Sequence, residues 1–192
     1  MDSKDFISEL KKGKNEAYDK LVDMYSQKIY YLCLKMLGNP SDAEDAVQTT
    51  FLKIYKGIKN FEGRSGLSTW IYKIAMNTCN DILRKRKTNF MVPLIAENGE
   101  NEENIKFDIV DKTENVEDAV LRREREKLIY ECIYLLPHGH RKFIVLRDLE
   151  GFSYAEIARI LDMNIGTVKS GINRARSKLM EILKTHSDNG EF

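Results

Sequence analysis

The sequence predicts an all-α protein in which two small helical bundles are joined by a flexible acidic linker. Apolar side chains recur at helical spacing through most of the 192 residues, and no segment alternates apolar and polar residues over the length of a strand. Residues 88–115 contain Pro93, Gly99 and many acids without any period, which is typical of a linker. The expected division is therefore 1–87, 88–115 and 116–192.

The first bundle is expected to hold three helices. Residues 16–37 keep helical apolar spacing for about six turns, and Gly38-Asn39-Pro40 ends that helix. Ser41-Asp42-Ala43-Glu44 has the pattern of a capping box, so a second helix is expected to begin there. Residues 60–68 contain two glycines and no period, which indicates a loop. A third helix is expected over about Thr69–Lys87.

The second bundle is predicted to end in a helix-turn-helix. Helical periodicity covers 116–136, and a further helix is expected over about 141–149. Ser153-Tyr154-Ala155-Glu156 is another capping box, which opens a short helix ending at Leu161. After a tight turn, a longer basic helix is expected over about Ile165–Leu183. Two helices in this arrangement are typical of DNA-binding proteins.

The near-neutral charge hides three unlike segments. The whole chain has 31 basic and 30 acidic residues, for a net charge of +1. Residues 1–87 hold 16 basic and 11 acidic side chains, residues 88–120 hold 2 and 9, and residues 121–192 hold 13 and 10. Two basic blocks therefore flank an acidic strip, and the total does not exclude a nucleic-acid partner.

Several protein classes are excluded or disfavoured. No run approaches the ~20 apolar residues of a membrane span, and the start lacks a secretory pattern, so we expect a cytoplasmic protein. Cys33, Cys79 and Cys132 are far apart, which gives no disulfide set, and the apolar helical stretches around Cys33 and Cys132 favour reduced, buried thiols there. No glycine-rich phosphate loop, hydrolase or kinase motif is present, and His138-Gly139-His140 lacks further ligands. We therefore expect no enzyme activity, no cofactor, no metal site and no small-molecule substrate.

The last basic helix is the strongest functional signal. The N-terminal end of such a helix meets base edges in the major groove, while later cations reach phosphates. The candidates for base contact are Thr167, Lys169, Ser170 and Asn173, and those for phosphate contact are Arg174, Arg176 and Lys178. The alternative is a solvated amphipathic helix whose apolar side simply packs.

A second basic block interleaves aromatic and cationic residues. It runs from the loop that begins at Phe61, through Trp70, Tyr72 and Lys73, to the basic residues 84–87. Such a mixture suits unpaired bases, because aromatic rings stack on bases and cations follow the backbone. The alternative is that Trp70 belongs to the core and that the basic run is solvated.

Three motif blocks resemble the extracytoplasmic-function (ECF) sigma factors, which are alternative sigma subunits of bacterial RNA polymerase. The blocks are Asp42-Ala-Glu-Asp-Ala-Val-Gln48, Ser68-Thr-Trp-Ile-Tyr-Lys-Ile-Ala75 with Asn77, and Gly166-Thr-Val-Lys-Ser170 with Arg174-Ala-Arg176. They occur in the order and at the spacing of that family. The resemblance covers nearly the whole chain apart from the linker.

The resemblance implies a role for each block. The first resembles region 2.2, which docks on the polymerase β′ clamp, so the implied core contacts are Asp45, Gln48, Thr49 and Leu52. Thr49 stands where the family commonly has Glu, which removes one charge. The second block, with the loop before it and the helix after it, resembles regions 2.3 and 2.4, which capture and melt the -10 element. The residues implied in that role are Phe61, Arg64, Ser65, Thr69, Trp70, Tyr72, Lys73, Asn77, Arg84 and Lys85. Trp70 matches the position of a wedge aromatic.

The third block resembles region 4, which reads the -35 element and implies a contact with the polymerase β flap. Gly171 stands where the family usually has Arg, so we expect either a weaker grip on the backbone or a closer approach there. The acidic linker matches the segment that threads the RNA channel of the polymerase. It either mimics RNA charge or acts only as a solubilising tether.

The sequence thus predicts a promoter-specificity subunit that binds core polymerase and promoter DNA. The resemblance also implies an anti-sigma factor as a further partner. Two rival functions are a helix-turn-helix repressor or activator, which would bind an operator without polymerase, and a helical adaptor that only sequesters proteins. Ordered binding to single-stranded -10 DNA separates the adaptor from the sigma factor.

Overall fold

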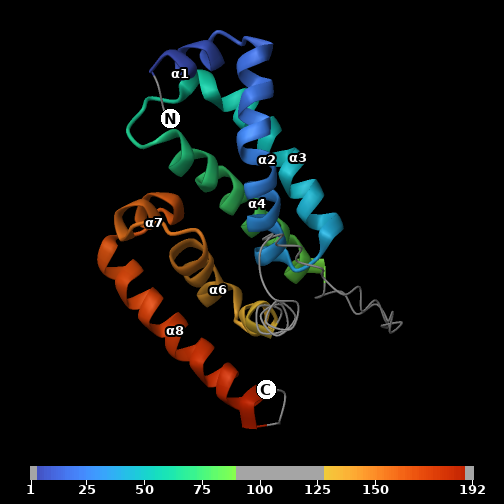
Figure 1. The fold of residues 1–192 in the computed structure, drawn as a ribbon, viewed down its shortest axis with the longest axis vertical. Helices are drawn as coiled ribbons and strands as arrows, with labels where there is room; N and C mark the ends of the chain where they lie inside the picture. The colour runs from blue at the N-terminus through green and yellow to red at the C-terminus, as the bar shows by residue number, and fades with distance from the viewer. Residues whose placement is uncertain (1–3, 90–127, 189–192) are drawn as a thin grey trace, which may run out of the picture.

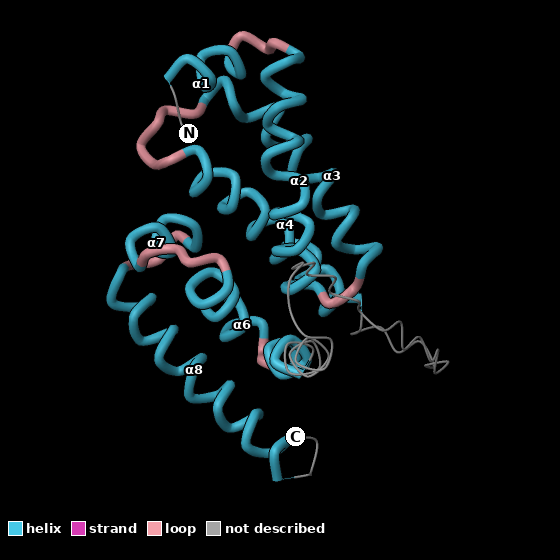
Figure 2. The backbone as a smooth tube through the Cα atoms, in the orientation of Figure 1, coloured by secondary structure: helices cyan, strands magenta, loops and turns pink. Residues whose placement is uncertain are grey.

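The computed structural model describes residues 4–89 and 128–188, and they form two helical bundles (Figure 1). Figure 2 shows helices joined by short loops in these ranges, without a strand, so the all-α prediction is confirmed. The N-terminal bundle consists of α1 (Lys4–Lys11), α2 (Asn15–Leu37), α3 (Pro40–Gly57), η1 (Ile58–Asn60) and α4 (Leu67–Asn89). The C-terminal bundle consists of a helix over 128–135, α6 (His138–Ile144), η2 (Val145–Leu149), α7 (Tyr154–Leu161) and α8 (Ile165–Asp188).

Helix α2 runs through the centre of the N-terminal bundle and ends where the sequence predicts. Leu21, Ile29 and Leu32 are fully buried along it. Gly38 closes the helix with a φ of 69°, and its N–H donates to the Leu34 carbonyl oxygen. A residue without a Cβ suits this left-handed conformation, which explains the predicted stop.

The start of α3 differs from the sequence-based prediction. The capping box expected at Ser41 is wrong, because Asn39 is the N-cap and its Oδ1 accepts a hydrogen bond from the Asp42 N–H at 3.0 Å. Pro40 takes the first helical position. Proline fits there because its fixed φ is helical and its missing N–H would have no partner in the helix.

Two further boundaries in the N-terminal bundle also differ. Helix α1 has no counterpart among the predicted helices, although its Phe6 and Leu10 pack into the core. Helix α4 begins at Leu67 rather than Thr69, and the side chain of Leu67 is fully buried, so it adds one more residue to the apolar side of the helix. Most of the predicted linker, and residues 116–127 of the helix predicted over 116–136, lie outside the described residues.

The helix-turn-helix has the predicted form. The capping box of α7 is confirmed: the Ser153 N–H donates to Glu156 at 2.9 Å, and the Glu156 N–H donates to Ser153 Oγ at 3.3 Å. The turn passes through Asp162, which has a φ of 56°, and Asn164 Oδ1 then accepts from the Thr167 N–H at 2.7 Å. Helix α8 continues to Asp188, five residues beyond the predicted end.

The helix expected over 141–149 begins earlier and changes geometry. Pro137 precedes α6, so the His138-Gly139-His140 segment forms its first turn rather than a break. From Val145 to Leu149 the backbone forms a π-helix. Such a widened turn is rare and has no signature in a single sequence, so periodicity could not reveal it.

All three cysteines are buried and none forms a disulfide, which confirms the prediction for Cys33 and Cys132 and adds Cys79. Cys33 of α2 and Cys79 of α4 share a hydrogen bond, and this bond together with burial raises the pKa of the Cys79 thiol. Thiols in this state are poor nucleophiles. Cys33 and Cys79 act here as small apolar side chains between α2 and α4.

Candidate nucleic-acid interface

One face of α8 is buried and the other carries the predicted DNA contacts. Val168, Ile172 and Ala175 are fully buried against the rest of the C-terminal bundle. The seven predicted residues are exposed: Thr167, Lys169, Ser170, Asn173, Arg174, Arg176 and Lys178. This division follows helical periodicity and leaves the basic side of α8 open to a partner.

Short-range contacts fix several side chains on this face. Ser170 Oγ donates to the Thr167 carbonyl oxygen at 3.1 Å, and Arg174 Nε donates to the Ser170 carbonyl oxygen at 3.3 Å. Arg176 forms an ion pair with Asp148, and the hydrogen bond and charge of that carboxylate raise the pKa of the guanidinium. Lys178 pairs with Glu181 at 2.7 Å. Arg176 and Lys178 are thus both held by intramolecular partners.

Gly171, where a weaker grip on the DNA backbone or a closer approach was expected, belongs to the buried side of α8 and faces the bundle. A Cβ at this position would overlap the ring of Phe143 in α6. Phe143 is itself only 6% exposed, so its ring has little room to move. The glycine therefore permits a close contact between α6 and α8.

The predicted -10 residues are not all exposed. Arg64, Asn77, Arg84 and Lys85 are exposed, and Ser65, Trp70 and Lys73 are partly buried. Phe61, Thr69 and Tyr72 are each 4% exposed. The sequence left open whether Trp70 contacts bases or belongs to the core. The structure instead brings the Phe61 and Trp70 rings together, with centroids 5.2 Å apart.

Trp70 is held on two sides. Its ring lies against Phe61 on one side, and its Cζ2 atom would be 3.3 Å from a Cβ at Gly57. The glycine therefore makes room for the indole at the end of α3. Trp70 is a partly buried ring on the edge of the bundle, with features of both the wedge and the core interpretations.

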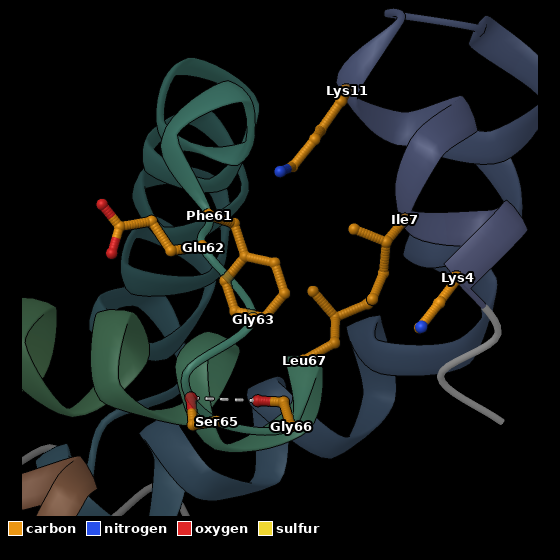
Figure 3. A pocket seen from close by; sticks show the side chains of 9 residues that line it. All are labelled: Lys4, Ile7, Lys11, Phe61, Glu62, Gly63, Ser65, Gly66 and Leu67. Atoms are coloured by element: carbon orange, nitrogen blue, oxygen red, sulfur yellow. Dashed lines mark hydrogen bonds between the residues drawn. The ribbon is translucent and has the colours of Figure 1, made fainter.

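An open cavity of about 510 Å³ lies between α1 and the loop after η1 (Figure 3). Ile7, Phe61 and Leu67 supply apolar side chains, while Lys4 and Lys11 extend from α1 toward the same space. The remaining lining residues are Glu62, Gly63, Ser65 and Gly66. The Glu62 carboxylate points away from the cavity in Figure 3. Apolar walls with a few polar groups are typical of ligand sites.

Sequence reasoning missed the part of this site that α1 supplies. Lys4, Ile7 and Lys11 lie on one side of an eight-residue helix, at spacings of three and four. The signal was present in that spacing, but an isolated helix of eight residues is too short to recognise with confidence from its periodicity.

The outer face of α3 carries the predicted polymerase contacts. Asp45, Gln48, Thr49 and Leu52 are all exposed. Tyr55, which the sequence reasoning did not select, lies one turn beyond Leu52, and both side chains are 60% exposed. The Tyr55 ring packs edge-on against Tyr18 at 4.9 Å between centroids. In Figure 1 this helix lies on the side of the N-terminal bundle away from α8.

Two other features are absent from residues 4–89 and 128–188. Within those ranges no three His, Cys, Asp or Glu side chains cluster in a way that could hold a metal ion. None of the helices described there is both long and apolar enough to cross a membrane.

Comparisons with known proteins agree with this geometry. Residues 21–88 match the Sigma-70 region 2 family and residues 126–179 match Sigma-70 region 4. The chain is 38% identical to the ECF RNA polymerase sigma factor SigW of Bacillus subtilis over 93% of this chain and 95% of that protein. It is 34% identical to an ECF RNA polymerase sigma-E factor of Haemophilus influenzae over 90% of both chains.

A solved structure shows the same fold. It is the sigma factor RpoE in complex with the anti-sigma factor NepR from Bartonella quintana, with a TM-score of 0.67 and 24% identity over 87% of this chain and 96% of that one. Two matched sigma regions and close relatives over nearly the full length establish the family. The chain belongs to the ECF sigma factors, which direct promoter-specific transcription initiation by RNA polymerase.

Proposed function

We propose that the two bundles divide promoter recognition between them. Residues 116–192 bind the duplex -35 element and the β flap of polymerase, and residues 1–87 bind the β′ clamp and capture the melted -10 strand. Residues 88–115 are the tether. The observation that carries the proposal is the cavity between α1 and the loop at 61–66, because it offers a concave site lined by Phe61, whose ring packs against Trp70 of α4.

Helix α8 is the proposed reader of the -35 element. Its exposed face begins at Thr167 in the first turn, where a helix end can enter the major groove, which is about 12 Å wide. Lys169, Ser170 and Asn173 reach base edges from this turn. Arg174, Arg176 and Lys178 lie further along and bind phosphates after leaving their intramolecular partners.

The cavity is the proposed site for one unpaired base of the -10 element. Phe61, Ile7 and Leu67 give it apolar walls for the faces of a base, and the loop backbone and Ser65 Oγ offer polar groups for its edge. Lys4 and Lys11 supply positive charge for the adjoining phosphates. Trp70, on the same side of the bundle, occupies the space left by the extruded base.

The outer face of α3 is the proposed docking surface for the β′ clamp. Leu52 and Tyr55 supply exposed apolar area, and Asp45 and Gln48 supply polar groups beside it. An apolar centre with a polar rim is typical of protein interfaces. Thr49 extends this surface without the charge that a carboxylate would add.

No covalent chemistry belongs to this function, so we propose a non-enzymatic, cytoplasmic protein without cofactor or small-molecule substrate. Binding energy from the strand offsets the few kcal/mol that unstacking and unpairing a base cost. We also propose an anti-sigma factor as a partner. The support is that the Bartonella quintana protein with this fold was solved together with its anti-sigma factor NepR.

A transcription assay tests the proposal. Purified full-length protein is added to core polymerase and a library of genomic DNA fragments, and the transcripts are sequenced. We expect transcripts that start at a common promoter sequence and that are absent without the protein. Gel shifts with and without core polymerase separate this function from that of a repressor, which binds its operator alone. Failure to bind core polymerase or any promoter would contradict the proposal.

A further inference from the structure

A glycine stands at the end of α3 where the backbone does not require one. Gly57 has a φ of −95° and a ψ of −18°, a right-handed helical conformation that residues with a side chain also adopt. Glycine is less favourable than alanine in such a conformation, because it loses more freedom on folding. The reason for a glycine at this position therefore lies in its surroundings.

The indole ring of Trp70 fills the space beside Gly57. A Cβ on Gly57 would lie 3.3 Å from Trp70 Cζ2 and 3.7 Å from Trp70 Cη2. The shorter distance is tighter than ordinary van der Waals contact, so the ring would have to move by a few tenths of an ångström. The missing side chain of Gly57 thus fixes how closely the indole approaches the end of α3.

Phe61 holds the same ring from the loop that follows η1. The Phe61 and Trp70 centroids are 5.2 Å apart, with 47° between the ring planes. Phe61 is 4% exposed, so its ring has little room to withdraw into a close-packed core. Residues 57–61, called the indole seat below, therefore contact Trp70 at both ends of the segment.

The indole seat continues α3 without a free joint. The Ile58 N–H donates to the Ile54 carbonyl oxygen, and the Phe61 N–H donates to the Ile58 carbonyl oxygen at 3.1 Å. Ile54 and Ile58 are 0% and 1% exposed, so both anchor the segment in the core. Segments with paired backbone groups and buried anchors rarely open. The seat therefore behaves as a rigid extension of α3.

The same helix carries the proposed polymerase surface. Leu52 and Tyr55 are each 60% exposed on α3, and Tyr55 precedes Gly57 by two residues. A short helix transmits a displacement along its length, because its backbone hydrogen bonds keep it stiff. The orientation that α3 takes on a partner therefore also determines the orientation of the Trp70 ring.

We propose that Gly57 is a positioning residue for promoter opening: the indole seat fixes Trp70 relative to α3, so that docking of α3 on polymerase also sets where the ring meets the promoter. The inference rests on the proposed functions of α3 and Trp70. Groups that act on a bound partner must be held within about 0.5 Å of the productive geometry. A Cβ at Gly57 uses up much of that tolerance.

Two variants of the full chain add a Cβ while keeping the backbone. They are Gly57→Ala and Gly57→Ser, and the pair guards against one variant failing to fold. Gly139→Ala is the matched control, because Gly139 lies in the first turn of α6 and a Cβ there would meet nothing within 4 Å. The control thus reports the effect of the same substitution in a helix without a ring beside it. Circular dichroism checks the fold of each variant.

The fluorescence of the free protein is the first measurement. Trp70 is the single tryptophan of the chain, so the emission spectrum reports the surroundings of this ring. Because Phe61 is buried, a ring displaced by the new Cβ moves toward solvent. We expect both Gly57 variants to show red-shifted emission and faster quenching by acrylamide. Gly139→Ala should match the wild-type protein in both.

Promoter opening with core polymerase is the second measurement. A base analogue in the -10 region reports opening, and biolayer interferometry and gel shifts report affinity for core polymerase and for closed complexes. We expect opening to slow about threefold to tenfold in the Gly57 variants, because a small misplacement of an acting group costs rate. Both affinities should stay within about twofold of the wild-type values, since the exposed faces of α3 and α8 are unchanged.

A double-mutant cycle shows whether Gly57 acts through Trp70. The Phe ring of Trp70→Phe lacks the outer indole atoms Cζ2 and Cη2 that a Cβ at Gly57 would meet. In the Trp70→Phe background, Gly57→Ala should therefore slow opening by less than about twofold further. The same slowing in both backgrounds would mean that Gly57 acts through another contact, which would overturn the inference.

The remaining outcomes separate this inference from the proposed function. Unchanged emission in both Gly57 variants would overturn the inference, and so would wild-type opening rates in variants whose emission has shifted. Loss of polymerase affinity in step with opening would show that Gly57 supports α3 itself rather than Trp70. If emission shifts but no form opens a promoter, wild type included, the proposed function fails and the indole seat is only a structural contact.

Discussion

The rings of Phe61 and Trp70 pack against each other at 5.2 Å between centroids, which joins the loop before α4 to the first turn of that helix. This pairing links a cavity-lining residue to the proposed wedge. Any change in one ring therefore alters the position of the other. It also explains why Trp70 is partly buried yet lies beside the proposed strand site.

Replacing Trp70 by alanine is expected to impair promoter opening more than initial binding. Loss of one stacking surface is worth about 1–3 kcal/mol, so we expect opening to slow by about tenfold or more. Closed-complex affinity, which depends on α8 and α3, should change little. Stopped-flow fluorescence from a base analogue in the -10 region measures opening, and gel shifts at low temperature measure closed complexes. Trp70→Phe is the control, and equal loss of both steps would contradict the wedge role.

The cavity lysines should contribute charge to single-strand binding. Lys4→Gln and Lys11→Gln are each expected to weaken binding of the -10 strand and to reduce the slope of log affinity against log salt by about 0.7. Lys12→Gln is the matched control, since Lys12 is exposed on the same segment and does not line the cavity. Fluorescence anisotropy across a salt series gives the slope. The same slope for Lys12→Gln and Lys11→Gln would argue against a site in the cavity.

Gly171→Ala is expected to destabilise the protein, although alanine favours helices over glycine. The added methyl group would overlap the Phe143 ring, and overpacking of this kind costs about 1–3 kcal/mol. The gain in helix propensity is only about 0.5–1 kcal/mol. Urea denaturation measures the free energy of unfolding, and Phe143→Leu in the same chain should restore part of it. Higher DNA affinity with unchanged stability in Gly171→Arg would show that this position faces DNA instead.

The α3 surface should affect polymerase binding alone. Leu52→Asp places a charge at the centre of the proposed interface and is expected to weaken binding to core polymerase by about tenfold or more. Thr49→Glu restores the charge common in the family and should strengthen binding. Biolayer interferometry with immobilised core polymerase measures both. Affinity for a -35 duplex is the internal control, and a parallel loss there for Leu52→Asp would indicate misfolding rather than a lost contact.

The α7 capping box should give the C-terminal bundle a pH-dependent stability. The hydrogen bonds from the Ser153 side chain and backbone lower the pKa of Glu156 from 4.5. A lowered folded-state pKa means that this stabilisation is complete above the unfolded pKa and is lost as pH falls through the folded one. Ser153→Ala should cost about 1 kcal/mol near neutral pH and less in acid. Urea denaturation near neutral pH and in acid measures the free energy of unfolding of the variant and the wild-type protein. The same loss of stability under both conditions would contradict the linkage.

Local patterns in the sequence predicted most helices and the sides they bury. The Ser153–Glu156 capping box and the stop at Gly38 depend on residues within a few positions, so one sequence reveals them. The start of α3 was misplaced because Asn39-Pro40 and Ser41–Glu44 both have helix-start patterns, and only the backbone decides between them.

The long-range contacts were not predictable in the same way. The burial of Tyr72 depends on Glu150 and Phe152, which lie about eighty residues away in the chain, so no periodicity contains that information. The role of Gly171 depends on Phe143 in another helix. The cavity depends on α1, which is too short to be distinguished by pattern and lies before the matched region 2.

The three buried cysteines offer an intrinsic chemical probe of local opening. Cys33 and Cys79 are in the N-terminal bundle and Cys132 is in the C-terminal bundle, and each is fully shielded from solvent. A maleimide can react with them only during an opening event, so labelling rates resolved by mass spectrometry yield a separate opening free energy for each bundle. The native chain can thus report, without any introduced label, whether its two halves open together or independently.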